Sequence, residues 1–364
     1  MPYGTVNAEQ MTTQSGYTLG AGNASSFKNR IINGNMVINQ RASGTTVTLN
    51  TSQDYQFLDR YRFVGGFGGY TNTVQQSTTA PSGFSTSLLW TNTASSGTIA
   101  SGAYNSFWQN IEGYNISDLA WGTADAKPIT LSFWVRSSVI GTYGVTFTNG
   151  TNYYVASYTV NTANTWEQKT VSIAGATTGT WNTSSSTGLT VKWDMGVGST
   201  YSASAGTWGT GNIWGLTGGI KFVETNGATF YITGVQIEVG TVATSFDYRP
   251  FGTEFSLCQR YFETSYDYGQ ALGATPTNIS YTRWSTNGTA NALEKWFRVS
   301  KRATPTVNTY DTAGNAGKIR IFDGISDANN ITPTGIFTTF NSMWITYNAT
   351  ANGMQFVYTA SAEL

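Results

Sequence analysis

Two acidic side chains in the segment FWQNIEGYNISDLAW are the first place where the sequence could do chemistry. Glu112 and Asp118 lie close together among aromatic residues. A glycoside hydrolase needs two carboxyl groups that flank the scissile sugar bond. Nothing in the sequence marks a raised pKa or a second acid at a fixed spacing. We therefore expect Asp118 to cap a turn and Glu112 to be a solvated strand residue, and we assign no catalytic residue and no enzymatic activity.

Three tryptophans form the second group of candidates. Trp181, Trp208 and Trp214 lie in stretches almost free of other apolar residues, such as SASAGTWGTGNIWGLTGG. Exposed indole rings stack on the C–H faces of sugars, so these three residues could line a sugar-binding site. Tryptophans that fill the end of a β-sandwich or a subunit contact would have the same sequence context. Both interpretations stay open, and packing in the core or an interface carries more weight.

Oxygen ligands are the third group. Asp59 and Glu238 lie on expected strands that could be neighbours, and they are weak candidates for a structural Ca²⁺ site. The alternative, which we favour, is that either carboxylate pairs with Arg60 or Arg62. The chain has no histidine and a single cysteine, Cys258, which excludes His-dependent triads and internal disulfides. We expect Cys258 to be buried, and we expect no cofactor and no metal.

The composition indicates an all-β protein. Charged residues make up 10% of the 364 residues, against about 25% in typical soluble proteins, while aromatic residues make up 14%. Such a chain is poor in helix formers and rich in β-branched, aromatic and turn residues. The net charge is zero without a basic run, which argues against nucleic-acid binding. No apolar run approaches a membrane span, and the N-terminus lacks the pattern of a signal peptide.

Many short strands separated by turn clusters are expected between residues 55 and 240. The clearest are YQFLDRYRFV, PITLSFWVRSS, YGVTFTNG, NYYVASYTV, TWEQKTVSIAG, GLTVKWDMGVG and ATFYITGVQIEVG. In PITLSFWVRSS, Ile129, Leu131, Phe133 and Val135 alternate with polar or mixed positions, as expected for a strand with one buried face. This spacing of strands is typical of a β-sandwich or jelly roll.

Three segments define the boundaries of the expected sandwich. Asn33-Gly34 within RIINGNMVINQR predicts a β-hairpin. The stretch from Thr229 to Val239 predicts a half-buried strand with a bulge at Gly234, whose Gln236 and Glu238 point away from the apolar face. The following DYRPFGTE contains Pro250 and Gly252 and indicates a domain junction.

A second β-region is expected after residue 254. The stretch from Glu254 to Tyr266 fits a short helix or a strand equally well. Further on, the pattern around Phe297, Val299 and Arg302 and the terminal FVYTASAEL both predict strands.

Four segments together carry a resemblance. These are the RIINGNMVINQR region with its preceding GAGNASSFKN, the ordered series LSFWVRSS, TWEQKTVSIAG and FYITGVQIEVG, the junction TFYITGVQIEVGTVATSFDYRPFGTEFSLCQRYF, and the C-terminal F-x-V-x-x-R-x-x-P-T-V pattern. They resemble structural proteins of tailed bacteriophages, especially tail-fibre-like proteins with a jelly-roll domain like a carbohydrate-binding module. The last pattern departs from that family at Ser300-Lys301, where Glu-Met is common.

The resemblance implies a virion component made in the host cytoplasm, first of all a tail fibre or tail appendage that contributes to host attachment. The alternatives are a capsid decoration or head-fibre protein and, from another class, a carbohydrate-binding module protein. The implied partners are further copies of the chain, in a homotrimer, other virion proteins, and a host surface glycan. The resemblance implies neither a nucleic-acid partner nor insertion into a membrane.

The expected architecture is therefore all-β, with a jelly-roll β-sandwich, a second smaller β-sandwich module and an extended N-terminal arm. Its three parts are an attachment arm with a hairpin over residues 1–48, the jelly roll over residues 49–248 and the C-terminal module over residues 249–364. The Thr-, Gly-, Ser- and Asn-rich stretch up to about residue 28 would be disordered alone, so we expect it to lie on a sister subunit or a neighbouring protein.

Overall fold

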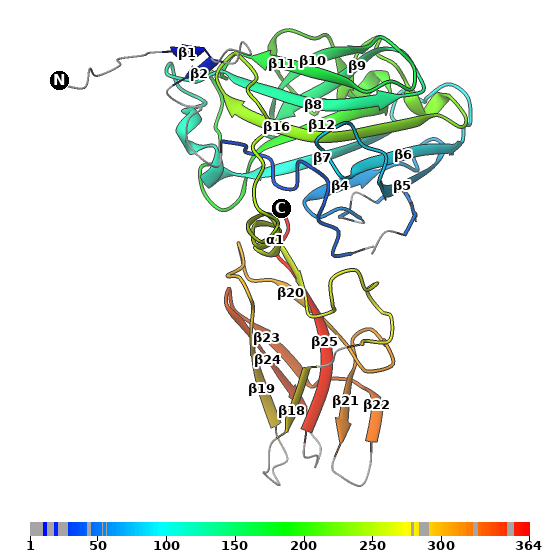
Figure 1. The fold of residues 1–364 in the computed structure, drawn as a ribbon, viewed down its shortest axis with the longest axis vertical. Helices are drawn as coiled ribbons and strands as arrows, with labels where there is room; N and C mark the ends of the chain where they lie inside the picture. Colours follow the sequence, from blue (N-terminus) through cyan, green and yellow to red (C-terminus); the bar gives the residue numbers. More distant parts are fainter. Residues whose placement is uncertain are drawn as a thin grey trace, which may run out of the picture. The chain divides into compact units, whose positions relative to one another are not determined.

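The chain folds into two compact β-units, as the computed structural model in Figure 1 shows. The first contains Met1–Met36, Thr48–Asp54 and Arg62–Pro250, and the second contains Val37–Val47, Tyr55–Tyr61 and Phe251–Leu364. The structure describes residues 10–12, 18–20, 28–41, 45–52, 54, 55, 57–277, 280–283, 291–322, 327–347 and 353–364. Half of the expected attachment arm, residues 1–9, 13–17, 21–27 and 42–44, lies outside these residues.

The first unit is a sandwich of two six-stranded antiparallel sheets, which confirms the expected fold class. In spatial order, the first sheet contains β14 (Trp208–Thr210), β10 (Asn152–Val160), β9 (Gly141–Thr148), β12 (Thr187–Val197), β7 (Tyr104–Glu112) and β4 (Tyr61–Val64). The second sheet contains β11 (Glu167–Ile173), β8 (Ile129–Ser137), β16 (Thr229–Val239), β6 (Ser87–Ala94), β5 (Thr71–Ser77) and β3 (Val47–Thr48).

Short elements complete the first unit. β13 (Ser202–Ala203) pairs in parallel with β15 (Gly215–Leu216), and β1 (Gln10–Thr12) pairs with β2 (Thr18–Gly20). Four single-turn 3₁₀ helices lie in the connections of the described residues: η1 (Gly113–Asn115), η2 (Ser117–Leu119), η3 (Ser199–Tyr201) and η4 (Phe222–Glu224).

Aromatic side chains fill the space between the two sheets. Phe107 of β7 stacks on Trp193 of β12 with their ring centroids 5.0 Å apart. From the opposite sheet, Phe133 of β8 approaches Trp193 edge-on at 6.1 Å, and Phe230 of β16 lies 6.2 Å from Phe107. All four side chains are fully buried. These rings bring the large apolar areas whose burial is the main favourable term in folding.

Strand β16 has the bulge that the sequence predicts. Its pairing with β8 shifts register between Thr233 and Gln236, and Gly234 has a φ of 63°. A Cβ atom at this glycine would lie 2.6 Å from the ring of Phe84, so no other residue fits without a shift. The expectation of a half-buried strand was wrong, because Gln236 and Glu238 are fully buried as well. After residue 240 the chain returns over these two side chains, and its polar groups form hydrogen bonds with them.

The segment around Asn33-Gly34 turns but forms no hairpin, which corrects that expectation. The Met36 N–H donates to the Asn33 carbonyl over 3.0 Å, yet residues 28–41 contain no strand. The segment instead bonds to β16, whose Val235 N–H donates to the Gly34 carbonyl over 2.9 Å. A Cβ atom at Gly34 would lie 2.1 Å from the Val235 carbonyl oxygen. The glycine therefore serves a close backbone approach rather than a hairpin turn.

Two other expected strands are shorter than predicted. In YQFLDRYRFV only β4 is a strand, because a turn precedes it in which Arg60 has a φ of 73°. The segment from Phe297 to Pro305 is irregular and connects β19 to β20, since Lys301 turns inward to a buried carboxylate instead of alternating outward.

The second unit contains one helix and two small sheets. The helix α1 (Phe251–Gln259) is followed by a strand, so the stretch from Glu254 to Tyr266 is partly helix and partly strand. One sheet contains β17 (Phe262–Thr264), β25 (Gly353–Ser361), β21 (Ile319–Phe322) and β22 (Asp327–Ile331), and β18 (Ser280–Arg283) and β20 (Thr306–Tyr310) also pair with β25. The other sheet contains β19 (Asn291–Trp296), β24 (Ser342–Tyr347) and β23 (Gly335–Thr338).

The core of the second unit mixes aliphatic and aromatic side chains, with Met343 and Ile345 of β24 packed in one cluster with Met354 and Phe356 of β25. A buried ion pair lies beside it, in which the Lys301 amine is 2.6 Å from the Glu263 carboxylate. Both side chains are fully inaccessible to solvent. The Tyr358 hydroxyl also donates to Glu263, over 2.7 Å. Removal of one partner from such a pair leaves an uncompensated buried charge.

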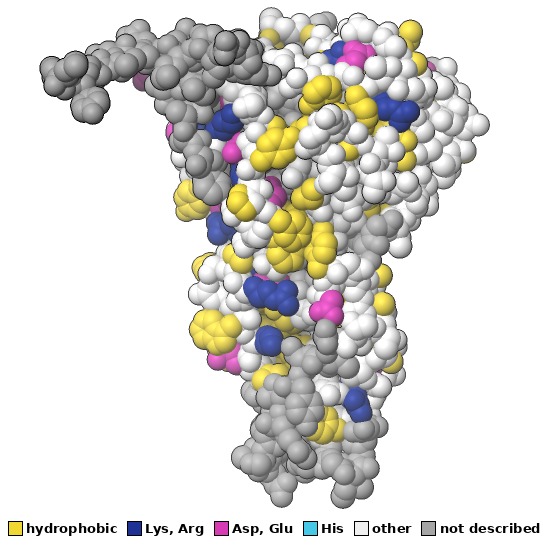
Figure 2. All heavy atoms as spheres, viewed as in Figure 1, with side chains coloured by type: hydrophobic (Ala, Val, Ile, Leu, Met, Phe, Trp, Pro, Cys, Tyr) yellow, Lys and Arg dark blue, Asp and Glu magenta, His cyan; other side chains and the backbone are white. Residues whose placement is uncertain are grey.

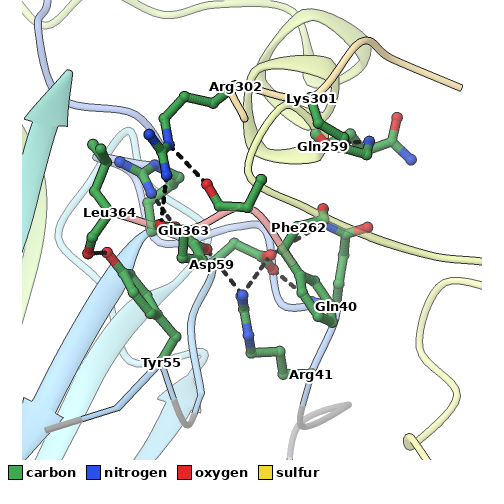
Figure 3. A network of polar contacts seen from close by, with 12 residues as sticks. Gln40, Arg41, Tyr55, Asp59, Gln259, Phe262, Lys301, Arg302, Glu363 and Leu364 are labelled. Atoms are coloured by element: carbon green, nitrogen blue, oxygen red, sulfur yellow. Dashed lines mark hydrogen bonds and ion pairs between the residues drawn. The ribbon is translucent and has the colours of Figure 1, made fainter. Parts of the chain in front are cut away.

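Arginines hold the last residues of the chain within the second unit (Figure 3). Arg41 and Arg60 both pair with the Glu363 carboxylate, and Arg41 also lies 3.0 Å from Asp59. Arg302 donates to the backbone carbonyls of Ala362 and Glu363 over 2.8 and 2.9 Å. These contacts join residues 37–47 and 55–61, which belong to the second unit, to the residues that follow β25.

Candidate functional site

Trp181 and Trp208 meet in one aromatic cluster at the sandwich. Together with Trp121 they form three edge-to-face pairs, with ring centroids between 4.7 and 5.6 Å apart. Each indole N–H already has an acceptor, which is the Thr178 carbonyl for Trp181 and the Ala174 carbonyl for Trp208. Trp181 and Trp121 are buried, and Trp208 is half-buried. These contacts are those of structural packing.

Trp214 lies in a separate cluster on the outer face of the first sheet. Its ring is 4.5 Å from Tyr104 and 5.3 Å from Trp108, both on β7. The amine of Lys192 lies 3.3 Å from the centre of the Trp214 ring, as a cation–π contact. Trp214 is 6% exposed, and its indole N–H donates to Asn212 over 2.7 Å. The structure therefore brings together only two of the three predicted tryptophans.

The two predicted acidic residues lie in different surroundings. Arg30 pairs with both carboxylate oxygens of Asp118 at 2.6 Å, and this hydrogen bonding holds the pKa of Asp118 below its usual range. Glu112 is buried at the end of β7, not solvated as expected. An acid kept ionised by an arginine is a poor proton donor, so this pair has no arrangement suited to glycoside hydrolysis.

Asp59 and Glu238 do not lie on neighbouring strands. Asp59 precedes β4 in a turn and pairs with Arg41, and burial raises its pKa to about 6. Glu238 lies on β16 in the other sheet, where it accepts hydrogen bonds from the Thr244 N–H at 2.8 Å and the Thr244 hydroxyl at 2.6 Å. Among the residues that the structure describes, no group of three or more metal-ligating side chains comes together.

The sequence analysis missed an exposed row of aromatic side chains on the second unit. On the sheet β19–β24–β23, Phe337 lies directly opposite Trp344, and Trp296 lies opposite Ser342. Their exposed fractions are 65% for Trp296, 59% for Phe337 and 37% for Trp344. Phe340, in the turn between β23 and β24, is 55% exposed. We call Trp296, Phe337, Phe340 and Trp344 the aromatic face.

The strand pattern explains why these rings point outward. In β24, Met343, Ile345 and Tyr347 enter the core, so Trp344 and Thr346 between them project from the other side of the sheet. Glu294 of β19 lies opposite Trp344 and is exposed on the same side. A tryptophan in the outward phase of the strand SMWITY was the signal in the sequence that could have identified this face.

Figure 2 shows one side of the molecule, on which charged side chains are few and scattered among uncharged groups. In the first unit, a hollow of about 310 Å³ lies beside the segment 197–221, with Lys221 and several hydroxyl groups at its wall. It has no aromatic side chain in its lining. Within the described residues, no helix is long and apolar enough to cross a membrane.

Comparisons with known proteins identify no family. No family model matches the sequence, and no curated protein matches it. Structural matches exist at low similarity. One is the enzymatically active domain of tailspike protein 4 of bacteriophage CBA120, with 14% identity and a TM-score of 0.30 over 59% of this chain and 22% of that one. This chain thus spans about a fifth of the length of the tailspike domain.

Two further matches cover nearly whole sugar-binding domains. A putative sugar binding protein from Bacteroides thetaiotaomicron has 10% identity and a TM-score of 0.34, over 58% of this chain and 100% of that one. A family 11 carbohydrate-binding module from Clostridium thermocellum, solved with a mixed-linked tetrasaccharide, has 11% identity and a TM-score of 0.27, over 57% and 99%. Similarities this low assign no ligand to this chain.

Proposed function

We propose that this chain is a surface protein of a tailed-phage virion, a tail fibre or similar tail appendage, and that its aromatic face contacts the host. The observation that carries the proposal is the exposure of Trp296, Phe337 and Trp344 on one side of a small sheet. Soluble proteins seldom leave several large rings together in solvent, and such a patch marks an interaction surface. Interface hot spots are enriched in tryptophan.

The chemistry of the face suits a glycan. Flat indole and phenyl rings stack on the C–H faces of sugars, while Glu294 and Thr346 on the same side offer acceptors and a hydroxyl for sugar hydroxyl groups. Stacking on a flat row needs no deep pocket. In contrast, Trp181, Trp208 and Trp214 turn their rings into contacts with other aromatic side chains, so the aromatic face replaces them as the proposed ligand surface.

Assembly and anchoring complete the proposal. The resemblance to tail-fibre-like proteins supports a homotrimer, in which the N-terminal arm attaches to other virion proteins. Deletion of residues 1–28 should abolish incorporation into particles and leave both β-units folded. Continued incorporation of the truncated protein would contradict the role of the arm, and a monomer by light scattering would contradict the trimer.

The test of the ligand surface compares matched aromatic variants. The purified chain and the double variant Trp296→Ala/Trp344→Ala are applied to an array of bacterial lipopolysaccharides and capsular polysaccharides. We expect wild-type binding to at least one glycan and a loss of tenfold or more in the variant. Tyr114→Ala is the control, because Tyr114 is 61% exposed on the first unit and outside the aromatic face. Equal binding by the wild type and the double variant would overturn the proposal.

A further inference from the structure

An arginine among aromatic rings lies on the outer side of the sheet that contains β11, β8 and β16. Phe133 and Val135 of β8 enter the core between the sheets. Trp134 and Arg136, in the other phase of the same strand, therefore project outward. Tyr231 of β16 is paired with Arg136 and projects to the same side. Figure 2 shows this face, where hydrophobic side chains gather over β8 and β16 with a basic side chain among them.

Local contacts hold the guanidinium of Arg136 in place. Its central carbon lies 4.9 Å from the centre of the Tyr231 ring, as a cation–π contact. The ring of Trp166, the residue before β11, lies 6.1 Å from the Tyr231 ring between their centroids. The Nε–H of Arg136 donates to the Asn164 carbonyl over 2.8 Å. We call Trp134, Arg136, Trp166 and Tyr231 the arginine face.

The arginine face presents donors that no protein acceptor takes up. Apart from its Nε–H, the guanidinium of Arg136 donates to no described residue. The indole N–H groups of Trp134 and Trp166 likewise have no acceptor among the described residues. Those of Trp181 and Trp208, in contrast, donate to backbone carbonyls. The three side chains of the arginine face with open donors are half-buried, so these donors are available to a ligand rich in acceptors.

The charge of Arg136 has no counter-charge on this face. Among the described residues, no carboxylate pairs with it. The nearest outward positions on β8, β11 and β16 are uncharged, namely Trp134, Gln168, Tyr231 and Thr233. The acid of the neighbouring strand, Glu167, pairs with Lys169 and accepts from the N–H groups of Asn161 and Thr162 at 2.9 and 2.8 Å. A lone positive charge on a lightly charged surface attracts an anionic ligand.

We propose that the arginine face binds a sugar that carries a carboxylate, as the uronic acids of acidic polysaccharides do. Such a ring offers what the face lacks: one negative charge, several hydroxyl acceptors and an apolar C–H surface. Arg136 binds the carboxylate through its two free amino groups, in the bidentate geometry that a guanidinium favours. Trp134 and Trp166 supply apolar surface for the ring and donate their indole N–H groups to its oxygens. This site lies in the first unit and does not rest on the aromatic face of the second.

The test measures binding of hexagalacturonate by isothermal titration calorimetry. The parent protein is the full chain with Trp296→Ala/Trp344→Ala, so the aromatic face does not contribute and the two proposals stand or fail separately. We expect hexagalacturonate to bind, and its methyl ester, which has the same rings without the charge, to bind about tenfold more weakly or less. Arg136→Met should reduce the affinity for the acid to that for the ester, and its retained binding of the ester shows that this variant is folded.

Two further variants separate charge from apolar contact. Trp166→Ala should weaken binding of the acid and of the ester by similar factors, because contact with the C–H surface does not depend on charge. Lys127→Met is the control for the loss of one positive charge, since Lys127 is exposed and precedes β8, whereas Arg136 lies near the end of that strand. The proposal is wrong if hexagalacturonate does not bind, if its ester or polyglutamate binds equally well, or if Arg136→Met binds the acid as the parent does.

Discussion

The described tryptophans are buried or half-buried in the first unit and exposed in the second. In the sandwich, rings such as Phe107 and Trp193 stack between the sheets, and Trp121, Trp181 and Trp208 pack on one another. In the C-terminal unit, aromatic side chains such as Phe356 and Tyr358 also enter the core, but Trp296, Phe337 and Trp344 are exposed to solvent. Residue type alone therefore does not mark a binding surface. What marks it is a ring on a face of a sheet that no other element covers.

The largest effect should come from breaking the buried ion pair of the C-terminal unit. Lys301→Met leaves Glu263 buried without a counter-charge and should cost about 3–5 kcal/mol of unfolding free energy, measured by urea denaturation. The double variant Lys301→Met/Glu263→Gln should recover much of that loss. If Lys301→Met is as stable as the wild type, this unit does not depend on the pair.

The matching change in the sandwich removes a ring from its tryptophan cluster. Trp181→Ala should cost about 3 kcal/mol, because the cavity loses contacts with Trp121 and Trp208. Unfolding of the sandwich, followed by near-UV circular dichroism, measures the effect. Normal stability together with lost glycan binding would return Trp181 to the group of ligand-binding candidates and remove the contrast between the units.

Lys192→Met should stabilise the sandwich in a pH-dependent way. The pKa of Lys192 is lowered to about 7 in the folded state, below about 10.4 in an unfolded chain. The cost of the buried charge is therefore complete below pH 7 and declines as the pH rises from 7 to 10.4. The unfolding free energy of the variant should exceed that of the wild type by about 1–3 kcal/mol at pH 6, and the difference should shrink toward pH 10. A difference independent of pH would show that the amine does not titrate in this range.

The smallest effect on stability is expected on the aromatic face. Trp296→Ala removes a ring that is 65% exposed, so the unfolding free energy should change by less than about 0.5 kcal/mol. Calorimetry of this variant and of Trp181→Ala compares the stability lost at an exposed tryptophan with that lost at a buried one. A loss as large as that of Trp181→Ala would mean that Trp296 is covered in the folded protein, and the aromatic face would lose its basis.

The sequence by itself determined the β-class, the strands with clear alternation and the bulge. Val171 and Ile173 of β11 and the apolar face of β8 follow from period-two patterns, which depend only on neighbours along the strand. Gly234 was identifiable because a slip in that pattern coincides with a glycine. Burial of Cys258 also follows from the residue type and is seen in the structure.

Only the tertiary structure decided what covers each face. Gln236 and Glu238 are polar in sequence yet fully buried, because the chain after residue 240 returns over them. Asn33-Gly34 makes a close approach to β16 instead of a hairpin, since the partner is about 200 residues distant. The exposure of Trp344 and the enclosure of Lys192 depend in the same way on non-local neighbours. Alternation fixes which side of a strand a residue takes, whereas the contacts across the fold decide whether that side meets solvent, another sheet or a ligand.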